Sequence, residues 1–176
     1  MTRLEVKRAA IPKTTARLIV VCGIPGSGKS TVARSMSALT GLPTISSSDV
    51  RAKLLGIKIE RFDNDFTPDE VLHTYESMFK LASDRLSSGK GLIMDGFFRS
   101  PGLRDRAKDL AIGLGAHYQG FCVYCDYDVA LRRLESRKAE GTVSPTGPSN
   151  LLEVSKMFEW PGADYLRIDN NHERSD

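Results

Sequence analysis

The sequence predicts an α/β fold in which helices cover both faces of a mostly parallel sheet. Short apolar runs alternate with amphipathic stretches along the 176 residues, and neither an internal repeat nor a shift in composition divides the chain. The composition, 40% hydrophobic and 27% charged, is typical of a globular domain with a sizeable core. One domain of this class therefore accounts for the folded part of the chain.

The first four elements alternate between strand and helix. Leu18–Cys22 is an apolar run of the buried-strand type, and the helix expected at Lys29–Leu39 is closed by Thr40-Gly41. A short strand is expected at Leu42–Ser47, and a helix follows at Val50–Leu55. Each strand is thus followed by a helix, as a parallel sheet requires.

A long amphipathic helix begins at Pro68 and ends before Gly89-Lys90-Gly91. Its apolar residues recur at helical spacing and are expected to form one core face: Val71, Leu72, Tyr75, Met78, Phe79, Ala82 and Leu86. The later strands are expected at Gly91–Asp95, Tyr118–Asp126 and Tyr165–Asp169. The later helices are expected at Leu103–Leu114, Val129–Lys138 and Leu151–Phe158.

Basic charge gathers at the N-terminus. Five Lys or Arg residues and one Glu lie up to residue 17, so this end carries the excess behind the net charge of +3. We expect residues 1–16 to be a flexible basic leader and residues 17–176 a single domain, with a Gly-, Pro- and Ser-rich lid around 138–150. No apolar run approaches the roughly 20 residues that cross a bilayer, and no signal peptide is evident, which favours a cytoplasmic protein without membrane contact.

One motif is specific enough to predict a ligand. Residues 23–30, GIPGSGKS, match the phosphate-binding loop pattern GxxxxGK[ST], directly after a strand and before a helix. Glycines let backbone N–H groups point at a phosphate, the lysine reaches the β- and γ-phosphates, and the next hydroxyl binds Mg²⁺. The pattern predicts a nucleoside triphosphate site formed by Gly23, Gly26, Ser27, Gly28, Lys29, Ser30 and Thr31.

Two carboxylates follow predicted strands. Asp49 is either the N-cap of a helix or a base that accepts the proton of an attacking hydroxyl, with Arg51 holding an anionic acceptor or the group in transfer. Asp95 ends the apolar run LIMD and is either a carboxylate that orients the waters of Mg²⁺ or a plain strand-end Asp. Arg104, at the start of the next helix, would face either the site or the surface.

An arginine cluster precedes the expected lid. Arg132, Arg133 and Arg137 would neutralise the charge that spreads over phosphoryl oxygens during transfer, and closure would exclude water. The alternative is a solvated helix face in which Glu135 pairs with its neighbours. The composition and position of the loop favour the functional interpretation.

Taken in order, GIPGSGKST, SSSDVR, IMDGFFRSPGLR, CDYDVALRRLESR and FEWP resemble the phosphate-loop kinase family of zeta toxins, chloramphenicol phosphotransferase and polynucleotide kinases. The resemblance runs from about Leu18 to Asp169. It implies the three-layer P-loop kinase fold, with a central five-stranded parallel sheet, helices on both faces and a lid. It also implies ATP and Mg²⁺ as cofactors and transfer of the γ-phosphate to an acceptor hydroxyl.

The resemblance implies roles for single residues as well. Lys29 would bind phosphate and Ser30 the metal. From the residues themselves, we expect Asp95 to serve the same metal and Arg133 to bind the nucleotide. Asp49 would be the catalytic base, Arg137 the lid arginine, and Arg104 the arginine after the third strand, near the substrate. The sequence departs from the family at one point. The base and the following arginine are usually three residues apart, whereas Asp49 and Arg51 are two apart, and Ser48 occupies the expected position.

Three functions remain open from the sequence. A small-molecule kinase acting on a sugar, nucleoside, nucleotide-sugar or antibiotic is favoured by acidic and aromatic residues within 56–79, where an acidic rim would repel a polynucleotide. A polynucleotide 5′-hydroxyl kinase would need a basic strand-binding channel, and a nucleotide-driven switch ATPase would hydrolyse without an acceptor. We expect the first, with ATP and a hydroxyl-bearing small molecule as partners.

Overall fold

The computed structural model describes residues 16–55, 66–141 and 147–171. The expected basic leader, apart from Ala16, and the centre of the expected lid lie outside the described residues. The same holds for residues 56–65 of the segment in which we expected the acceptor to bind. Within the described part, no helix combines the length and the apolar character needed to cross a membrane.

Five parallel strands form one sheet in the order β2–β3–β1–β4–β5. The strands are β1 Arg17–Cys22, β2 Thr44–Ser46, β3 Leu92–Asp95, β4 His117–Tyr124 and β5 Tyr165–Asp169. In the centre of the sheet, β1 pairs Val21 with Asp95 of β3 and Cys22 with Cys122 of β4. The predicted five-stranded parallel sheet is confirmed.

The helices lie close to the positions predicted for them in the sequence. They are α1 Lys29–Thr40, α2 Ser47–Leu55, α3 Pro68–Ser87, α4 Pro101–Gly113, α5 Tyr127–Ala139 and α6 Leu151–Lys156, the last preceded by the 3₁₀ turn η2 Pro148–Asn150. The largest difference is at α2, which begins at Ser47 rather than Val50 and shortens the preceding strand. In α3, the expected core face is buried except at its N-terminal end, where Leu72 is 48% exposed.

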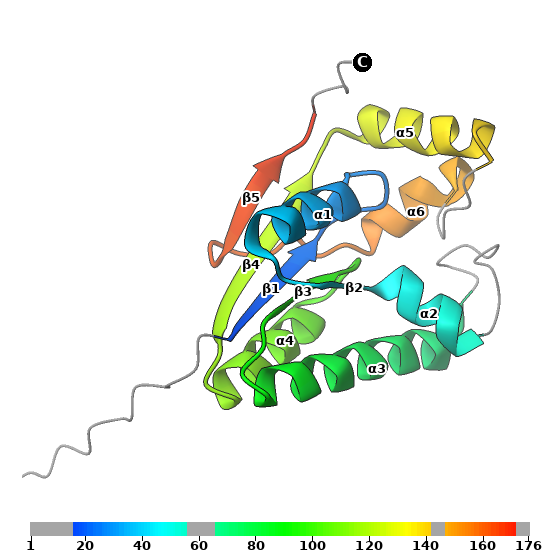
Figure 1. The fold of residues 1–176 in the computed structure, drawn as a ribbon. Coiled ribbons are helices and arrows are strands. Elements are labelled where there is room, and N and C mark those ends of the chain that lie inside the picture. Colours follow the sequence, from blue (N-terminus) through cyan, green and yellow to red (C-terminus); the bar gives the residue numbers. More distant parts are fainter. Residues whose placement is uncertain (1–15, 56–65, 142–146, 172–176) are drawn as a thin grey trace, which may run out of the picture.

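The core has two parts because successive side chains of a strand point to opposite faces of the sheet. Leu18 and Val20 of β1 pack on the face covered by α3 and α4, whereas Ile19 and Val21 pack on the face covered by α1. Figure 1 shows the sheet between these helices. The central strands β1 and β3 are therefore buried on both faces, which explains their continuous apolar sequences.

The carboxyl ends of all five strands lie at one edge of the sheet, because the strands are parallel. Figure 1 shows α2, α5 and α6 around this edge. In open parallel sheets, ligands bind outside the carboxyl ends of the strands. The fold thus brings together the ends of β1, β2 and β3, where the sequence places its candidate functional residues.

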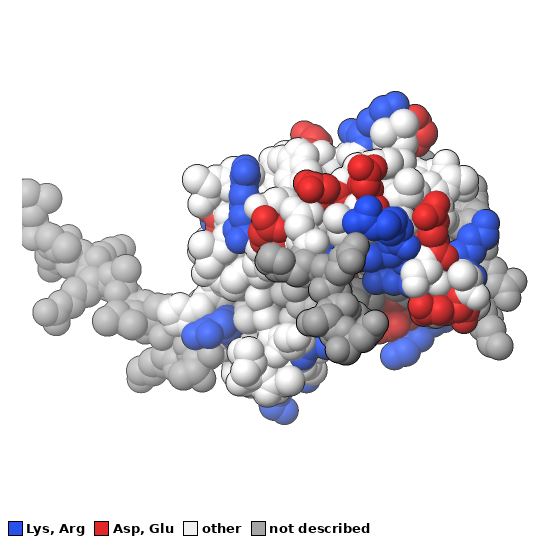
Figure 2. Space-filling model, turned by 90° about the horizontal axis from the view of Figure 1, so that it is seen from above, with Lys and Arg blue, Asp and Glu red and all other residues white. Residues whose placement is uncertain are grey.

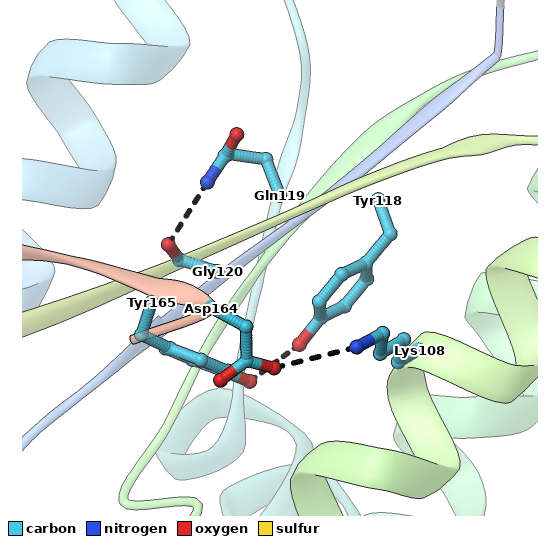
Figure 3. A network of polar contacts seen from close by, with 6 residues as sticks. All are labelled: Lys108, Tyr118, Gln119, Gly120, Asp164 and Tyr165. Carbon is cyan, nitrogen blue, oxygen red and sulfur yellow. Dashed lines mark hydrogen bonds and ion pairs between the residues drawn. The ribbon is translucent and has the colours of Figure 1, made fainter. Parts of the chain in front are cut away.

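A polar network holds the edge strand β5 near its start (Figure 3). The hydroxyl groups of Tyr118 and Tyr165 are hydrogen-bonded to each other, and Lys108 of α4 forms an ion pair with Asp164 at 3.4 Å. The ring of Tyr165 lies over Gly120, where an added Cβ would be 2.6 Å from ring atoms. The glycine in β4 therefore leaves the space that this tyrosine needs.

The Tyr118 hydroxyl makes stability depend on pH in the alkaline range. Burial raises its pKa from the ordinary 10.0 to about 12. The unfolded chain therefore loses this proton at a lower pH than the folded chain, so stability falls as pH rises from about 10 to 12. We expect Tyr118→Phe to flatten this fall in urea unfolding at a series of pH values. Tyr127→Phe, at an exposed tyrosine of α5, is the control, and equal pH slopes for wild type and Tyr118→Phe would contradict the assignment.

Candidate active site

The phosphate-binding loop connects β1 to α1, and its backbone conformation requires glycine. Gly28 has a φ of 92°, in the left-handed region, and a Cβ there would overlap the side-chain amide of Asn170. Within the loop, the Ser27 N–H donates to the Ile24 carbonyl at 3.2 Å. The Lys29 ammonium donates to the same carbonyl at 2.8 Å, so the lysine side chain folds back over the phosphate-binding loop.

Two side chains from distant parts of the chain hold the loop from outside. The Asn170 amide, after β5, donates to the Ser27 carbonyl at 2.7 Å. Arg133 of α5 donates to the carbonyls of Gly26 at 3.4 Å and of Asn170 at 2.8 Å. We expected Arg133 to bind the nucleotide directly, whereas the structure places its guanidinium against the loop backbone. Its position is that of a residue that shapes the loop.

A cavity of about 280 Å³ opens beside the loop. Its wall combines α1, α2, α5 and the end of β3 with residues from α3 and α6. The predicted site residues in this wall are Gly26, Lys29, Ser30, Arg51, Asp95 and Arg137. The structure therefore brings six predicted site residues, from four separate stretches of sequence, to one cavity.

Asp95 is the most deeply buried charged residue of the cavity wall. Its side chain is 3% exposed, and one carboxylate oxygen, Oδ1, has no hydrogen-bond partner among the residues that the structure describes. Burial raises the pKa of this carboxyl above its ordinary value, and the negative charge of Asp49 also raises it. The charge of Lys29 and a hydrogen bond from the Ser30 hydroxyl act in the opposite direction. A buried carboxylate of this kind, with one oxygen available, is suited to bind a cation.

Asp49 lies outside the cavity wall. It is exposed in the first turn of α2, whereas Ser47, Ser48 and Arg51 line the cavity. Residues three apart on a helix share a face, and residues two apart do not. Because α2 begins at Ser47, the helix face that carries Arg51 also carries Ser48 and not Asp49. Asp49 is therefore not part of the cavity wall, although it is near enough for its charge to raise the pKa of Asp95. Asp95 is the one carboxylate among the described residues of the wall.

Arg104 also lies outside the wall, in the core. Only 4% exposed, it donates to the Phe98 carbonyl at 2.7 Å. Its guanidinium carbon lies 5.8 Å from the centre of the Phe158 ring and 5.9 Å from the centre of the Tyr165 ring. This arginine fixes the loop after β3 instead of contacting a substrate from the cavity wall, where we had expected it.

Two residues of the site are not evident from sequence patterns. Arg99 lines the cavity from the loop between β3 and α4, and it lies within the quoted stretch IMDGFFRSPGLR, in which we assigned roles to Asp95 and Arg104 but not to Arg99. Asn170 contacts the phosphate-binding loop 143 residues after it in the chain. The only available signal for Asn170 is its place after β5, at the same edge of the sheet as the loop.

Comparison with known proteins agrees with this geometry. A family model described as an AAA domain matches residues 18–159. An uncharacterised protein of Mycobacterium tuberculosis is 28% identical over 167 residues, which cover 92% of this chain and 33% of that protein. The chain thus spans about a third of the length of the first curated relatives it matches. The adenylate kinase of Mycolicibacterium smegmatis is 28% identical over 165 residues, with 86% of each chain covered.

Solved structures share the fold over nearly the whole chain. A Chloroflexus aurantiacus protein, provisionally classed as a kinase, superposes with a TM-score of 0.70 at 25% identity, covering 89% of this chain and 86% of the other. A gluconokinase of Sinorhizobium meliloti superposes with a TM-score of 0.63 at 20% identity, covering 92% and 86%. With its phosphate-binding loop at the end of the central strand of a five-stranded parallel sheet, the chain has the P-loop kinase fold and belongs to the AAA domain family.

Proposed function

We propose that the chain is an ATP-dependent phosphotransferase that moves the γ-phosphate of ATP to a hydroxyl group of a small molecule. The observation that carries this proposal is the set of residues that line the cavity. Lys29 and Ser30 line it next to the phosphate-binding loop, together with Asp95 and with residues of α2, α3 and the loop after β3. A site that only hydrolysed ATP would not need the residues of α2, α3 and the loop after β3. The kinase relatives support the same interpretation.

The residues present fit a magnesium ion. The Ser30 hydroxyl is hydrogen-bonded to the Asp95 carboxylate, whose Oδ1 has no partner in the described part of the chain. Mg²⁺ typically takes one or two protein oxygens together with phosphate oxygens and waters. When bound, Mg²⁺ supplies charge that neutralises the phosphate oxygens in the transition state. Ser30 would be its ligand, and Asp95 would orient its waters.

The chain's own residues then position the reacting groups. The loop N–H groups and Lys29 hold the β- and γ-phosphates, and Arg137 lies in the cavity wall where it can neutralise the transferred group. The acceptor oxygen forms a bond to the γ-phosphorus as the bond to the ADP oxygen breaks. Because such transition states are loose, with little bond formation to the acceptor, the hydroxyl proton is lost late, to an oxygen of the transferred phosphate or to water, and needs no strong base. We therefore assign no essential role to Asp49.

A test of the function offers γ-labelled ATP and Mg²⁺ with two acceptor pools in parallel, a fractionated small-metabolite pool and a 5′-hydroxyl oligonucleotide. We expect label in a small-molecule fraction. Label on the oligonucleotide would identify a polynucleotide kinase, and label only in free phosphate would identify a switch ATPase. The face seen in Figure 2 has acidic and basic side chains interleaved, without the continuous basic stripe that a strand-binding channel would need.

Lys29→Ala should reduce phosphate transfer by about 10²-fold or more, because the loop would lose the charge that contacts the transferred phosphate. The variant should keep the wild-type fold, since the lysine is only partly buried. Lys90→Ala, which removes an exposed lysine before the amino end of β3, is the matched control and should transfer at the wild-type rate. Transfer by Lys29→Ala at the wild-type rate would contradict the assignment of the site.

Asp95→Asn and Asp49→Asn should differ sharply in activity. Asp95→Asn should reduce transfer by about 10²-fold or more, because the metal waters lose their carboxylate. Asp49→Asn should stay within about threefold of wild type, as expected for a charge outside the cavity. A loss of about 10²-fold in a folded Asp49→Asn variant would instead identify Asp49 as the base and require α2 to turn when the acceptor binds.

Asp95→Asn should also make the free protein more stable at neutral pH. The pKa of Asp95 is raised by folding, so the folded chain holds this proton more tightly than the unfolded chain. The ionised group therefore costs stability, increasingly so as pH rises from 3.8 through the raised value. Urea unfolding between pH 4 and pH 7 should show a smaller decline for Asp95→Asn than for wild type. A variant less stable than wild type at pH 7 would contradict this.

A further inference from the structure

The three cysteines of the chain gather where β1 leads into the phosphate-binding loop, and the proposed reaction uses none of them. Cys22 is the last residue of β1 and directly precedes Gly23. Cys122 lies opposite it on β4, in register, and Cys125 follows the end of that strand. All three are buried free thiols. Thiols from two separate stretches of sequence thus lie at the base of the candidate nucleotide site.

Cys22 and Cys122 form a pair, whereas Cys125 has a different contact. The first two lie on the sheet face covered by α3 and α4, and their thiols are hydrogen-bonded to each other. The Cys125 thiol instead donates to the Gly26 carbonyl at 3.9 Å. In-register residues of neighbouring strands have Cα atoms about 4.8 Å apart, within the span of roughly 4.4 to 6.8 Å that a disulfide bridges. The pair is therefore placed to form a disulfide.

The two paired thiols differ in acidity, which gives them different parts in an oxidation. The hydrogen bond from Cys22 lowers the pKa of the Cys122 thiol, burial acts against this, and the charge of Arg104 lowers the pKa further. The same hydrogen bond, together with burial, raises the pKa of Cys22. Because the thiolate is the form that attacks an oxidant, Cys122 reacts first and Cys22 second.

A bond between these two sulfurs would act directly on the phosphate-binding loop. The Cβ atoms of a disulfide are about 3.8 Å apart, less than the spacing of about 4.8 Å between neighbouring strands. The bridge therefore draws β1 and β4 together at this point. Gly23, the next residue, already lies against β4, because a Cβ there would overlap the Val123 carbonyl. The start of the loop has no room on that side and must move when the bridge forms.

We propose that Cys22 and Cys122 are a reversible oxidation site, at which hydrogen peroxide converts the thiol pair to a disulfide that weakens nucleotide binding. The Cys122 thiolate attacks one peroxide oxygen, and the O–O bond breaks. Cys122 becomes a sulfenic acid, and the departing hydroxide takes up the proton that Cys122 had released. The Cys22 thiol then attacks the Cys122 sulfur, the S–O bond breaks, and water leaves. Both thiols are oxidised, the peroxide is reduced to water, and a dithiol reverses the reaction.

The pair is enclosed, since both side chains are 0% exposed. The peroxide must therefore enter through a local opening of the fold, and segments that bind ligands are drawn from the least stable parts of a structure. The oxidation site stands independently of the proposed function, whereas its effect on nucleotide binding rests on that function.

The first test treats reduced wild-type protein with hydrogen peroxide, then unfolds it, blocks the remaining thiols with N-ethylmaleimide and maps the peptides by mass spectrometry. We expect a link between Cys22 and Cys122, a blocked thiol at Cys125, and loss of the link after treatment with dithiothreitol. Cys125→Ala is the matched control that should still form the link, and Cys22→Ala should form none. Mapping of the wild type decides the point even if a variant fails to fold.

The second test is the affinity for MgADP, measured by isothermal titration before and after oxidation. It uses Cys125→Ala, so that oxidation of the thiol beside Gly26 contributes nothing. We expect oxidation to weaken binding by about tenfold or more, because the loop that surrounds the β-phosphate is displaced, and dithiothreitol should restore it. In the double variant Cys22→Ala/Cys125→Ala, peroxide should leave the affinity unchanged.

Two results would overturn the inference. In the first, peroxide leaves the wild-type thiols free or oxidises Cys125 alone. In the second, the linked protein binds MgADP as tightly as the reduced protein does. Failure of the reduced wild type to bind MgADP would instead remove the proposed function and leave the oxidation site, because the peptide mapping needs no nucleotide. The two failures are therefore distinguishable.

Discussion

The buried carboxylate of Asp95 beside Lys29 is the interaction on which the site depends. Asp95 ends β3 in register with Val21, the penultimate residue of the strand that leads into the phosphate-binding loop. Burial disfavours its charge, and Lys29 and Ser30 offset this only in part. The ionised carboxylate thus lowers the stability of the fold, and a magnesium–nucleotide complex would supply positive charge beside it. Sites that bind and react commonly reduce the stability of a fold in this way.

The parallel topology explains how residues far apart in sequence reach one cavity. With β1 in the centre, the loop after it has neighbours on both sides, β3 with Asp95 and β4 leading to α5. On one side, α2 and the loop after β3 contribute Arg51 and Arg99. On the other, Arg133 and Asn170 hold the loop backbone without lining the cavity. Nucleotide binding and acceptor binding are therefore assigned to different elements, which can vary independently.

The sequence was sufficient for the sheet and the phosphate-binding loop, since both are local patterns, an apolar strand and a fixed spacing of Gly, Lys and Ser. It was insufficient for Asp49 because the outcome depends on where α2 begins. A helix that starts at Ser47 has Ser48 and Arg51 on one face and Asp49 on another. The signal available in the sequence was that Ser48, and not Asp49, lies three residues before Arg51. Arg104 was misplaced because a buried arginine that bonds a carbonyl looks, in sequence, like one that binds substrate. Arg99 depends on the backbone turn at Phe98, for which the sequence carries no pattern.

The central claim is that the cavity recognises phosphate groups, with the loop and Lys29 as the main contacts. Its most direct test is the affinity of the wild-type protein, in the presence of Mg²⁺, for ATP, ADP, AMP and adenosine. Recognition through the loop predicts tight binding of ATP and ADP and a loss of about 10²-fold or more on going to AMP, which lacks the β-phosphate that the loop surrounds. Equal affinity for adenosine and ADP would contradict the account, because the loop would then contribute nothing to binding.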